Sequence, residues 1–575
     1  MAGKRLSLLA LWGVALCANG GAWAQSAPSP SQTRPPVITA APTAPTRIVL
    51  PRIEAGGAIP AEAKKLHFVL TGFAVKDEFK DLVAPRQILE KPLLGKRVSV
   101  AQIFDFAGKL QALYVRAGYP LVRVVISPQE LGNAARVELR VVDGFIERID
   151  ASAIDASVRP RVLAVVGGLL NKHQLTQREL ERKLLIAGEA PGLVLNGIFT
   201  GGKQVGGSIL ILTGRYRPVS VSLYGDDAMP AVFGTGQVVA TASLNSVLGL
   251  GEQITVSAAG LPDMDFTTAN PTRRYLTASL GVPLGVDGWS LNGSITNGIT
   301  TPRVAASAAS QGTLTEGYFG LSYALIKRRE FGLTLSGKFD MADEEVDSLV
   351  FNPAVPLSLD RTRALRGSVD GFWRRPESGT LISYGVIVSQ GLDAFGARTA
   401  ADATSELPLS RDGADAVFTK LSGHFSVTQS LPASLFVTFI GYGQTSFNKP
   451  LLTSEQFDLV GAQMLSGYDA GALSGDTAWV TRAELGRNFA LPKMPVVMTP
   501  YLFAATGERI LEQPTTLEQA GVHASNLGAG LRINVAGNKT VSTDFYGFVE
   551  GSKQHTDDPA QDNGWRLFIG GVVRY

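Results

Sequence analysis

Residues 565–575, at the end of the chain, read WRLFIGGVVRY. Side chains in an extended strand point alternately to opposite sides, so this stretch has two distinct faces. One face carries Trp565, Leu567, Ile569, Gly571, Val573 and Tyr575, and the other carries Arg566, Phe568, Gly570, Val572 and Arg574. An open sheet edge does not survive in lipid, so the last strand of a membrane barrel must pair with the first. We therefore expect this strand to close a barrel, with Trp565 and Tyr575 at the closure.

The whole region from 216 to 575 keeps this period of two. Residues 276–282 (LTASLGV) and 289–296 (WSLNGSIT) each place apolar side chains on one face and small or polar ones on the other. The connections alternate between a short turn, PLGVDG at 283–288, and a long polar stretch at 297–317. Such alternation is typical of an outer-membrane barrel, here an antiparallel one of about 16 strands around a polar lumen. A soluble β-sandwich is the alternative, but its polar face would carry more Lys and Glu.

The N-terminal region predicts export. Residues 1–24 have a basic start, an apolar stretch from 6 to 18 and a small-residue cleavage site at Ala22-Trp23-Ala24, which together predict a signal peptide. Cleavage removes Cys17, the only cysteine, so the mature chain has no disulfide chemistry. Residues 25–63 are rich in Pro and Ala and predict an extended linker, with no helix that would obstruct the barrel. No later run of 18 apolar residues predicts a helical membrane span.

Two similar α+β modules precede the barrel. In residues 64–148, Ser99 and Gln102 form a capping box before an amphipathic helix, and RVELRVV at 136–142 alternates as a half-buried strand. Residues 149–215 repeat the design, with Thr176 and Glu179 capping a second helix before two strands. Tandem modules of this kind indicate an array.

Composition and motifs exclude several classes of function. The formal net charge of +3 is too small to predict nucleic-acid binding. The five histidines are scattered and none falls at metal-ligand spacing, so neither a metal nor a cofactor is predicted. The sequence contains no HExxH, no P-loop, no complete GxGxxG and no plausible Ser-His-Asp frame, and we therefore do not expect an enzyme. Asp476 and Glu484 are interpreted as structural rather than as an acid–base pair.

Residues 114–149 resemble the first POTRA domain of the haemolysin secretion and activation family, the outer-membrane transporters of two-partner secretion. They read YVRAGYPLVRVVISPQELGNAARVELRVVDGFIERI, and residues 150–215 resemble the second domain less closely. The resemblance implies an outer-membrane barrel with its POTRA domains in the periplasm. It also implies an exported partner protein, a β-helical adhesin or cytolysin, and insertion into the membrane by the barrel assembly machinery.

Residues 461–479, GAQMLSGYDAGALSGDTAW, resemble the loop that folds back into the lumen in this family. The resemblance implies a gate built from a loop segment and a facing part of the barrel wall. The loop positions are Leu465, Ser466, Gly467, Tyr468, Gly475 and Asp476. The wall positions are Glu484, Phe503, Ala505 and Gly507.

Two of these positions depart from the family pattern. The family has Val-Arg where this chain has Leu465-Ser466, and an aspartate where it has Ala505. Losing both charged partners avoids a stranded buried charge. We expect Ser466 to hydrogen-bond to Glu484 instead, which gives a looser gate. On this hypothesis, Ser466→Arg together with Ala505→Asp lowers the noise of the channel conductance.

The modules are predicted to bind an extended partner segment along a sheet edge. The candidate residues are Leu110, Tyr114 and Val124 in the first module, and Leu193, Leu195 and Phe199 in the second. The alternative is that these apolar side chains belong to the cores. Two other functions remain open at this point. One is an insertase of barrel proteins, which usually carries more POTRA domains, and the other is a passive porin, which has no use for them.

Overall fold

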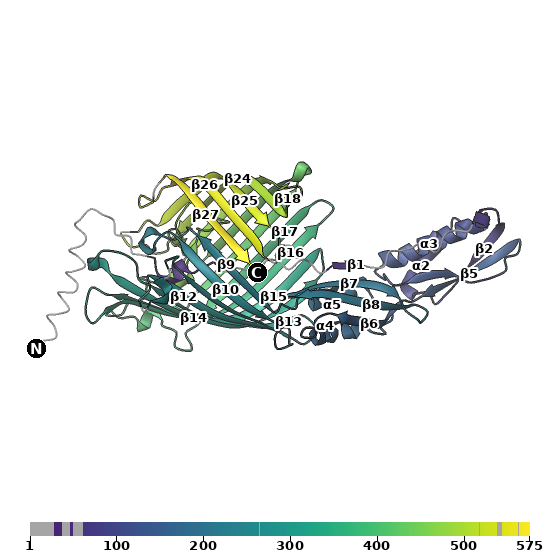
Figure 1. Cartoon of the computed structure of the whole chain (residues 1–575), viewed down its shortest axis with the longest axis horizontal. Coiled ribbons are helices and arrows are strands. Elements are labelled where there is room, and N and C mark those ends of the chain that lie inside the picture. Colours follow the sequence, from purple (N-terminus) through teal and green to yellow (C-terminus); the bar gives the residue numbers. More distant parts are fainter. Residues whose placement is uncertain are drawn as a thin grey trace, which may run out of the picture.

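The computed structural model describes residues 28–36, 47–49 and 61–575, apart from residues 264, 269, 517, 538–542 and 562. The predicted signal peptide lies outside the described residues. Two α+β modules follow one another at one end of a large closed barrel (Figure 1). The predicted fold class is confirmed.

The first module packs helices on a four-stranded sheet of order β3-β2-β5-β4. Its elements are η3 (Ala61–Lys64), β2 (His67–Lys76), η4 (Lys80–Leu82), α2 (Val83–Glu90), β3 (Arg97–Ser99), α3 (Val100–Arg116), β4 (Arg123–Ile126) and β5 (Ala134–Val142). The predicted capping box begins α3: the Ser99 amide donates to Gln102 Oε1 at 2.7 Å, and the Gln102 amide donates to Ser99 Oγ at 3.3 Å. The apolar face of α3 is buried against the sheet.

The second module has the sheet order β1-β7-β8-β6. Its elements are β6 (Phe145–Ala153), α4 (Arg159–Val166), η5 (Gly167–Leu169), α5 (Gln177–Ala187), β7 (Leu193–Gly201) and β8 (Gly207–Tyr216). Thr176 caps α5 as predicted, since its hydroxyl accepts from the Glu179 amide at 3.3 Å. The edge strand β1 (Arg47–Val49) comes from far upstream and runs parallel to β7.

The barrel is antiparallel and closed, with each strand next to its neighbour in the chain. Its strands are β9 (Val219–Asp226), β10 (Gln237–Asn245), β11 (Gln253–Gly260), β12 (Arg273–Leu284), β13 (Trp289–Thr300), β14 (Ser310–Lys327), β15 (Phe331–Ser348), β16 (Val355–Arg375), β17 (Thr380–Gly391), β18 (Thr419–Ser430), β19 (Leu435–Thr445), β22 (Thr477–Arg487), β23 (Phe489–Ala490), β24 (Val496–Ile510), β25 (Gly521–Val535), β26 (Asp544–Thr556) and β27 (Trp565–Arg574). The two-residue β23 continues β22 along the same neighbour, β24, so the barrel has 16 strands.

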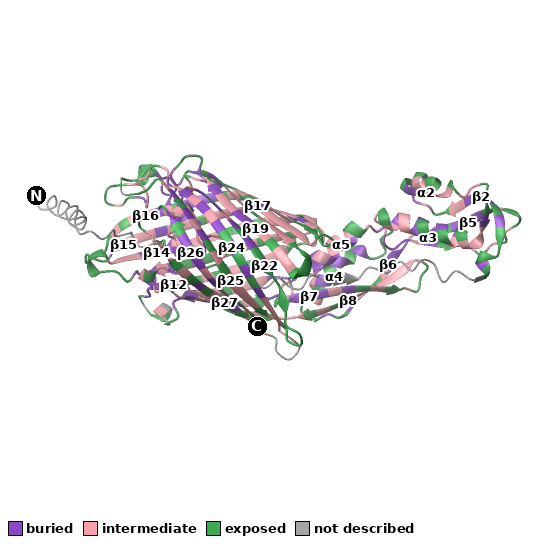
Figure 2. Cartoon of the chain, turned by 90° about the horizontal axis from the view of Figure 1, so that it is seen from above, coloured by how far each residue is buried: buried purple, intermediate pink, exposed green. Residues whose placement is uncertain are grey.

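The alternation predicted from the sequence sets the two faces of the wall. Leu276, Leu280 and Ile295 are exposed on the outer face, where apolar side chains suit lipid. Thr277 and Thr296 face the lumen and their hydroxyls lie 2.9 Å apart. Figure 2 shows exposed and less exposed residues alternating along the barrel strands. Among the described residues, no helix is long and apolar enough to cross a membrane.

The last strand pairs with the first over a short seam. β27 pairs with β9 from Gly570 opposite Asp226 to Arg574 opposite Ser222. Tyr575 extends the seam by exchanging two backbone hydrogen bonds with Val221, at 2.8 and 3.1 Å. Trp565 lies at the other end of β27 and is exposed. The aromatic end of the chain therefore stands at the closure.

The turns at the module end of the barrel are short, as at 285–288, 328–330 and 376–379, and the opposite end carries longer loops. Much of the stretch predicted as a long loop at 297–317 is strand, because β13 runs to Thr300 and β14 starts at Ser310. The longest connection, residues 446–476, is called the lumenal loop below. It contains η11 (Thr453–Glu455), β20 (Phe457–Asp458) and β21 (Ser474–Gly475).

Candidate functional site in the lumen and at the modules

The lumenal loop contacts the barrel wall on two opposite sides. On one side, the Glu455 carboxylate accepts from Arg366 of β16 at 2.8 Å and pairs with Lys420 of β18 at 2.8 Å. On the other side, Ser466 contacts β26. The loop starts before the predicted residue 461 and ends earlier than 479, because Thr477, Ala478 and Trp479 already belong to β22. A segment held on both sides obstructs the lumen.

The partner of Ser466 is a different glutamate from the predicted one. Its hydroxyl donates to Glu550 Oε2 at 2.6 Å and accepts from Arg482 Nη1 at 3.0 Å. Glu484, the predicted partner, instead accepts from Arg482 and Arg532 at 2.8 Å each. The prediction of a Ser466–Glu484 bond is therefore wrong. The reason is that both oxygens of Glu484 are occupied by guanidinium groups of the wall.

The lumen does contain the guanidinium that the loop lacks, but the wall supplies it. Arg482 is fully buried, and its guanidinium lies 3.7 Å from the centre of the Phe503 ring. It stands directly across the strands from Ala505. Arg482 also pairs with Glu550 at 2.7 Å, so two arginines and two glutamates form one balanced group with Ser466.

This arrangement removes the basis for the predicted effect of Ser466→Arg with Ala505→Asp. A second guanidinium at 466 would meet Arg482 in a buried site. Ala505 packs in an apolar cluster with Leu465, Tyr468 and neighbouring wall residues, where a carboxylate would lose its water. We now expect this double substitution to loosen the loop.

The other predicted gate residues lie in the same contact. The Tyr468 hydroxyl donates to the backbone oxygens of Ser525 and His555 at 3.1 and 3.0 Å. A Cβ atom added to Gly467 would lie 3.0 Å from Ser552 Oγ, and one added to Gly475 2.9 Å from Arg509 Cβ. Gly507 allows no side chain, since a Cβ atom there would lie 2.5 Å from the Trp479 oxygen.

Asp476 ties the end of the lumenal loop to two other loops. Its fully buried carboxylate accepts from Arg411 at 2.6 Å, and from the backbone amides of Leu451 and Glu512 at 3.1 and 2.7 Å. Arg411 belongs to the long connection between β17 and β18. A carboxylate with this many donors is a structural junction, as its sequence context predicted.

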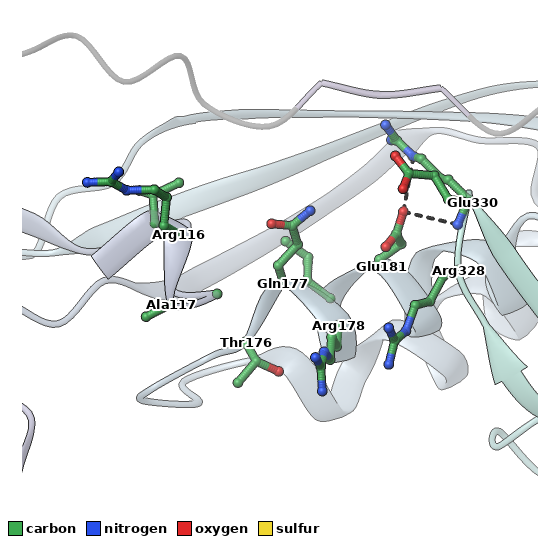
Figure 3. Close-up of a pocket in the computed structure, with 12 residues that line it drawn as sticks. Arg116, Ala117, Thr176, Gln177, Arg178, Glu181, Arg328 and Glu330 are labelled. Atoms are coloured by element: carbon green, nitrogen blue, oxygen red, sulfur yellow. Dashed lines mark hydrogen bonds and ion pairs between the residues drawn. The ribbon is translucent and has the colours of Figure 1, made fainter. Parts of the chain in front are cut away.

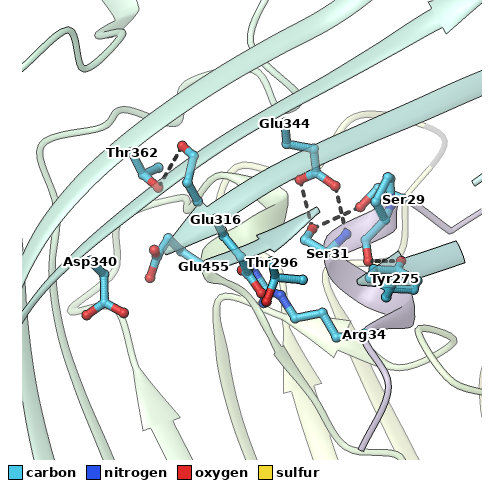
Figure 4. Close-up of polar contacts among 12 residues, drawn as sticks. Ser29, Ser31, Arg34, Tyr275, Thr296, Glu316, Asp340, Glu344, Thr362 and Glu455 are labelled. Carbon is cyan, nitrogen blue, oxygen red and sulfur yellow. Dashed lines mark hydrogen bonds and ion pairs between the residues drawn. The ribbon is translucent and has the colours of Figure 1, made fainter. Parts of the chain in front are cut away.

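Residues 28–36 also lie in the lumen, which corrects the prediction that the whole stretch 25–63 is a linker. The 3₁₀ turn η2 (Pro30–Thr33) sits against the inner wall (Figure 4). Ser31 donates to the buried Glu344 from both its amide and its hydroxyl, each at 2.8 Å. Arg273 Nη2 donates to the Thr33 oxygen at 2.7 Å. The prolines that argue against a long helix are compatible with a short turn bound by wall side chains.

Residues 28–36, called the N-terminal lumenal segment below, contact both the barrel wall and the lumenal loop. Arg34 pairs with Glu316 of β14 at 2.7 Å. A Cβ atom added to Gly471 would lie 3.1 Å from Pro28 and 3.2 Å from Gln32. The segment and the loop together obstruct the lumen, whereas the sequence predicted no obstruction from residues 25–63.

In the modules, the predicted partner-binding side chains are in the cores. Leu110, Tyr114, Val124, Leu193 and Leu195 are buried, and Phe199 packs against the second core. A partner cannot reach the five buried side chains in the folded modules, so their predicted role as contact residues is wrong. The prediction of binding along a sheet edge concerns the backbone and is not affected by this burial.

The second module is fastened to the barrel by charged residues of α5. Lys183 pairs with Asp287 at 2.7 Å, in the turn between β12 and β13, and Arg182 Nη2 donates to the Asp287 oxygen at 2.7 Å. The hydrogen bond and positive charge of Lys183 lower the pKa of Asp287. Lys327, at the end of β14, pairs with Glu189.

A cleft of about 580 Å³ lies where the two modules meet the barrel (Figure 3). The end of α3, the start of α5 and the turn 328–330 line it. One wall is closed by Glu181, which accepts from the Arg329 amide at 3.3 Å. The cleft thus marks the joint between the first module and the remainder of the molecule.

One local signal in the sequence points to the buried network. In WVTRAELG (479–486), Arg482 lies two residues before Glu484 and therefore on the same face of the strand. Other wall residues of this network, or in contact with the loop or with η2, carry no such local signal. Examples are Arg273, Glu344, Arg366, Lys420, Arg532 and Glu550.

A closed barrel of 16 antiparallel strands with two α+β modules at one end is the architecture of an outer-membrane transporter with periplasmic POTRA domains. The family described as haemolysin secretion/activation protein ShlB/FhaC/HecB matches residues 206–533, and the ShlB-type POTRA domain matches residues 70–144. The first match covers more than half of the chain. This chain therefore belongs to that family, the outer-membrane transporters of two-partner secretion, with its POTRA domains in the periplasm.

Solved structures agree with the fold. CdiB from Escherichia coli is 18% identical, with a TM-score of 0.68 and coverage of 100% of this chain and 99% of its own. CdiB from Acinetobacter baumannii is 15% identical, with a TM-score of 0.58 and coverage of 99% and 97%. No curated protein shows significant sequence similarity to this chain.

Proposed function

We propose that this transporter recognises an unfolded exported protein at the sheet edges of its POTRA domains and passes it through the barrel to the cell surface. The observation that carries the proposal is that the N-terminal lumenal segment is held by hydrogen bonds and an ion pair to the wall. Polar contacts of this kind are replaced by water when a segment moves out, so this segment can leave without exposing a large apolar core. The lumenal loop is also bound by ion pairs, but it buries Leu465 and Tyr468 against the wall, so its movement costs more.

The partner is proposed to be a large β-helical adhesin or cytolysin. A chain that enters unfolded can fold outside as successive strands emerge, which gives translocation a direction without a nucleotide. The barrel assembly machinery is proposed to insert the transporter itself, as expected for a protein with an antiparallel barrel in the outer membrane.

Tethering the lumenal loop to the wall tests this proposal. The only cysteine is Cys17, in the predicted signal peptide. Two cysteines introduced into the barrel can therefore form a disulfide with each other without competition from a native cysteine of the barrel. The pair Gly467→Cys and Ser552→Cys joins the loop to β26 across a gap short enough for a disulfide. We expect oxidation to lower secretion of the partner by at least tenfold, and a reductant to restore it.

The matched control joins two wall strands without the loop. Thr277→Cys with Thr296→Cys cross-links β12 and β13, whose hydroxyls lie 2.9 Å apart in the lumen. This pair should leave secretion unchanged when oxidised. Full secretion through the Gly467–Ser552 cross-link would show that the loop does not have to move, and the proposed route would then be wrong.

A further inference from the structure

The sheet of the second module has its β7 edge occupied by the chain itself. Arg47, Ile48 and Val49 of β1 lie opposite Asn196, Gly197 and Ile198 of β7 in parallel register. The β7 edge means here the side of the β7 backbone that faces away from β8. The partner segment in the proposed function needs an edge of this kind, and β1 covers it.

The occupation is short compared with the edge. β7 runs from Leu193 to Gly201 and pairs with β8 along its whole length, whereas β1 covers three of its residues. A three-residue strand has few hydrogen bonds, and it persists because it belongs to the same chain and so has a high effective concentration. A longer extended segment pairs with more of β7 and can displace it.

The position of β1 in the chain connects this edge to the lumen. Residues 28–36 are bound inside the barrel, and ten residues separate Pro36 from Arg47. In Figure 1, β1 lies outside the barrel beside the second module. One short connection therefore joins the N-terminal lumenal segment to the β7 edge.

The number of residues in this connection limits how far apart the two bound segments can lie. Arg34 pairs with Glu316, and β14 continues from there to Lys327, which pairs with the second module. At about 3.3 Å per residue and a strand tilt near 40°, that part of the wall is about 28 Å high. The eleven steps from Pro36 to Arg47 span at most about 36–40 Å. The number of residues therefore allows the two segments to be bound at the same time but limits how far apart they can lie.

We propose that residues 47–49 are a place-holder on the β7 edge, and that an extended segment of the exported partner displaces them and thereby frees the N-terminal lumenal segment. This inference rests on the proposed function and adds its regulation. Recognition in the periplasm and opening of the lumen become one coupled event. The lumen stays obstructed while the edge has no partner.

The test uses the full-length protein and a labelled peptide of the chain's own residues 43–52, TAPTRIVLPR. Ile48→Pro removes a backbone donor from β1 and disfavours its pairing, whereas Ile48→Thr keeps the donor and suits a strand. We expect the Pro variant to bind the peptide at least tenfold more tightly than the unaltered protein, and the Thr variant to match the unaltered protein. Equal binding by all three would overturn the place-holder.

The coupling is read from channels in planar lipid bilayers. We expect Ile48→Pro to raise the open fraction severalfold, as should Glu344→Ala, which removes the acceptor of Ser31. Saturating peptide should not close the Ile48→Pro channel, because the peptide fills the edge without being joined to the lumenal segment. An unchanged open fraction in Ile48→Pro, beside a raised one in Glu344→Ala, would overturn the coupling.

Failure of the proposed function gives a different pattern. If the purified partner does not compete with the peptide for Ile48→Pro, displacement of β1 by the partner is overturned, and the proposed function still stands as long as the Gly467–Ser552 cross-link blocks secretion. Full secretion through that cross-link would overturn the proposed function whatever the peptide does. Competition by the partner, with opening of the unaltered channel, supports both steps.

Discussion

At the scale of single residues, the lumenal contact depends on charge balance rather than on the position of one arginine. Arg482, Arg532, Glu484 and Glu550 neutralise one another around Ser466, and three of the four are buried. Removing one partner of a buried ion pair costs about 3–5 kcal/mol because the other charge is left in a site of low polarity. The guanidinium of this contact can therefore come from the wall, from Arg482, instead of from the loop.

A charge swap tests this balance. Ser466→Arg adds a positive charge to the group, and Arg482→Ser removes one, so each single change should raise channel noise and lower the melting temperature. The double variant restores neutrality and should recover most of both losses, with a coupling free energy of about 1–3 kcal/mol.

The measurements for the swap are single-channel noise and thermal unfolding in detergent. Arg487→Ser is a matched control, because Arg487 is an exposed arginine at the end of the same strand. Strictly additive losses in the double variant would show that the two sites do not share a charge requirement.

At the scale of elements, the β27–β9 seam is the shortest pairing between the 16 strands of the barrel. It pairs from Gly570 to Arg574, whereas β25 and β26 pair from Ala524 to Val535. Tyr575 therefore supplies two hydrogen bonds where few exist. An unpaired amide at a membrane barrel edge lacks water to replace its partner.

Deleting Tyr575 should lower the temperature at which the barrel loses its compact form on a gel. Two lost hydrogen bonds account for about 1–3 kcal/mol. Tyr575→Phe should behave like the unaltered chain, since it keeps the backbone and the ring. Tyr575→Ala separates the two contributions, and a loss in Tyr575→Ala equal to that of the deletion would assign the effect to the ring.

At the scale of the whole molecule, polar contacts between α5 and the barrel turns hold the second module in place. Lys183 and Arg182 both reach Asp287, and Lys327 pairs with Glu189. Exposed ion pairs contribute little stability and are screened by salt. The ion pairs by themselves therefore hold the module weakly, and Val286 of the same turn adds an apolar contact with the module core.

The joint predicts a specific response to charge reversal and to pH. Lys183→Glu should widen the distance distribution between spin labels on α5 and on the barrel, and adding Asp287→Lys should narrow it again. Because docking lowers the pKa of Asp287, its contribution is present above the ordinary aspartate pKa of about 3.9 and disappears as the pH falls below it. The distribution should stay constant from pH 8 to 5 and widen below about pH 4.

Spin-label distances measured by pulsed EPR provide the readout for this joint. High salt at neutral pH should also widen the distance distribution, as acid does. If the distance distribution changes with neither charge reversal nor salt, the buried part of the contact, rather than the ion pairs, positions the module.

The sequence by itself determined the elements and the order of the domains. Period two along the C-terminal half, caps at Ser99 and Thr176, and the resemblance of residues 114–149 were enough to place strands, helices and modules. These signals are local, since they depend on residues a few positions apart. The alternation also showed which barrel residues face inward.

Only the tertiary structure decided what meets inside the lumen. Ser31 binds Glu344, which is 313 residues away, and Ser466 binds Glu550, 84 residues away. Alternation assigns a residue to a face but not to a partner across the lumen. The Pro-rich stretch showed no pattern because its binding groups belong to the wall. The same holds for β1, whose pairing depends on the free backbone of β7 and leaves no mark in the side-chain sequence.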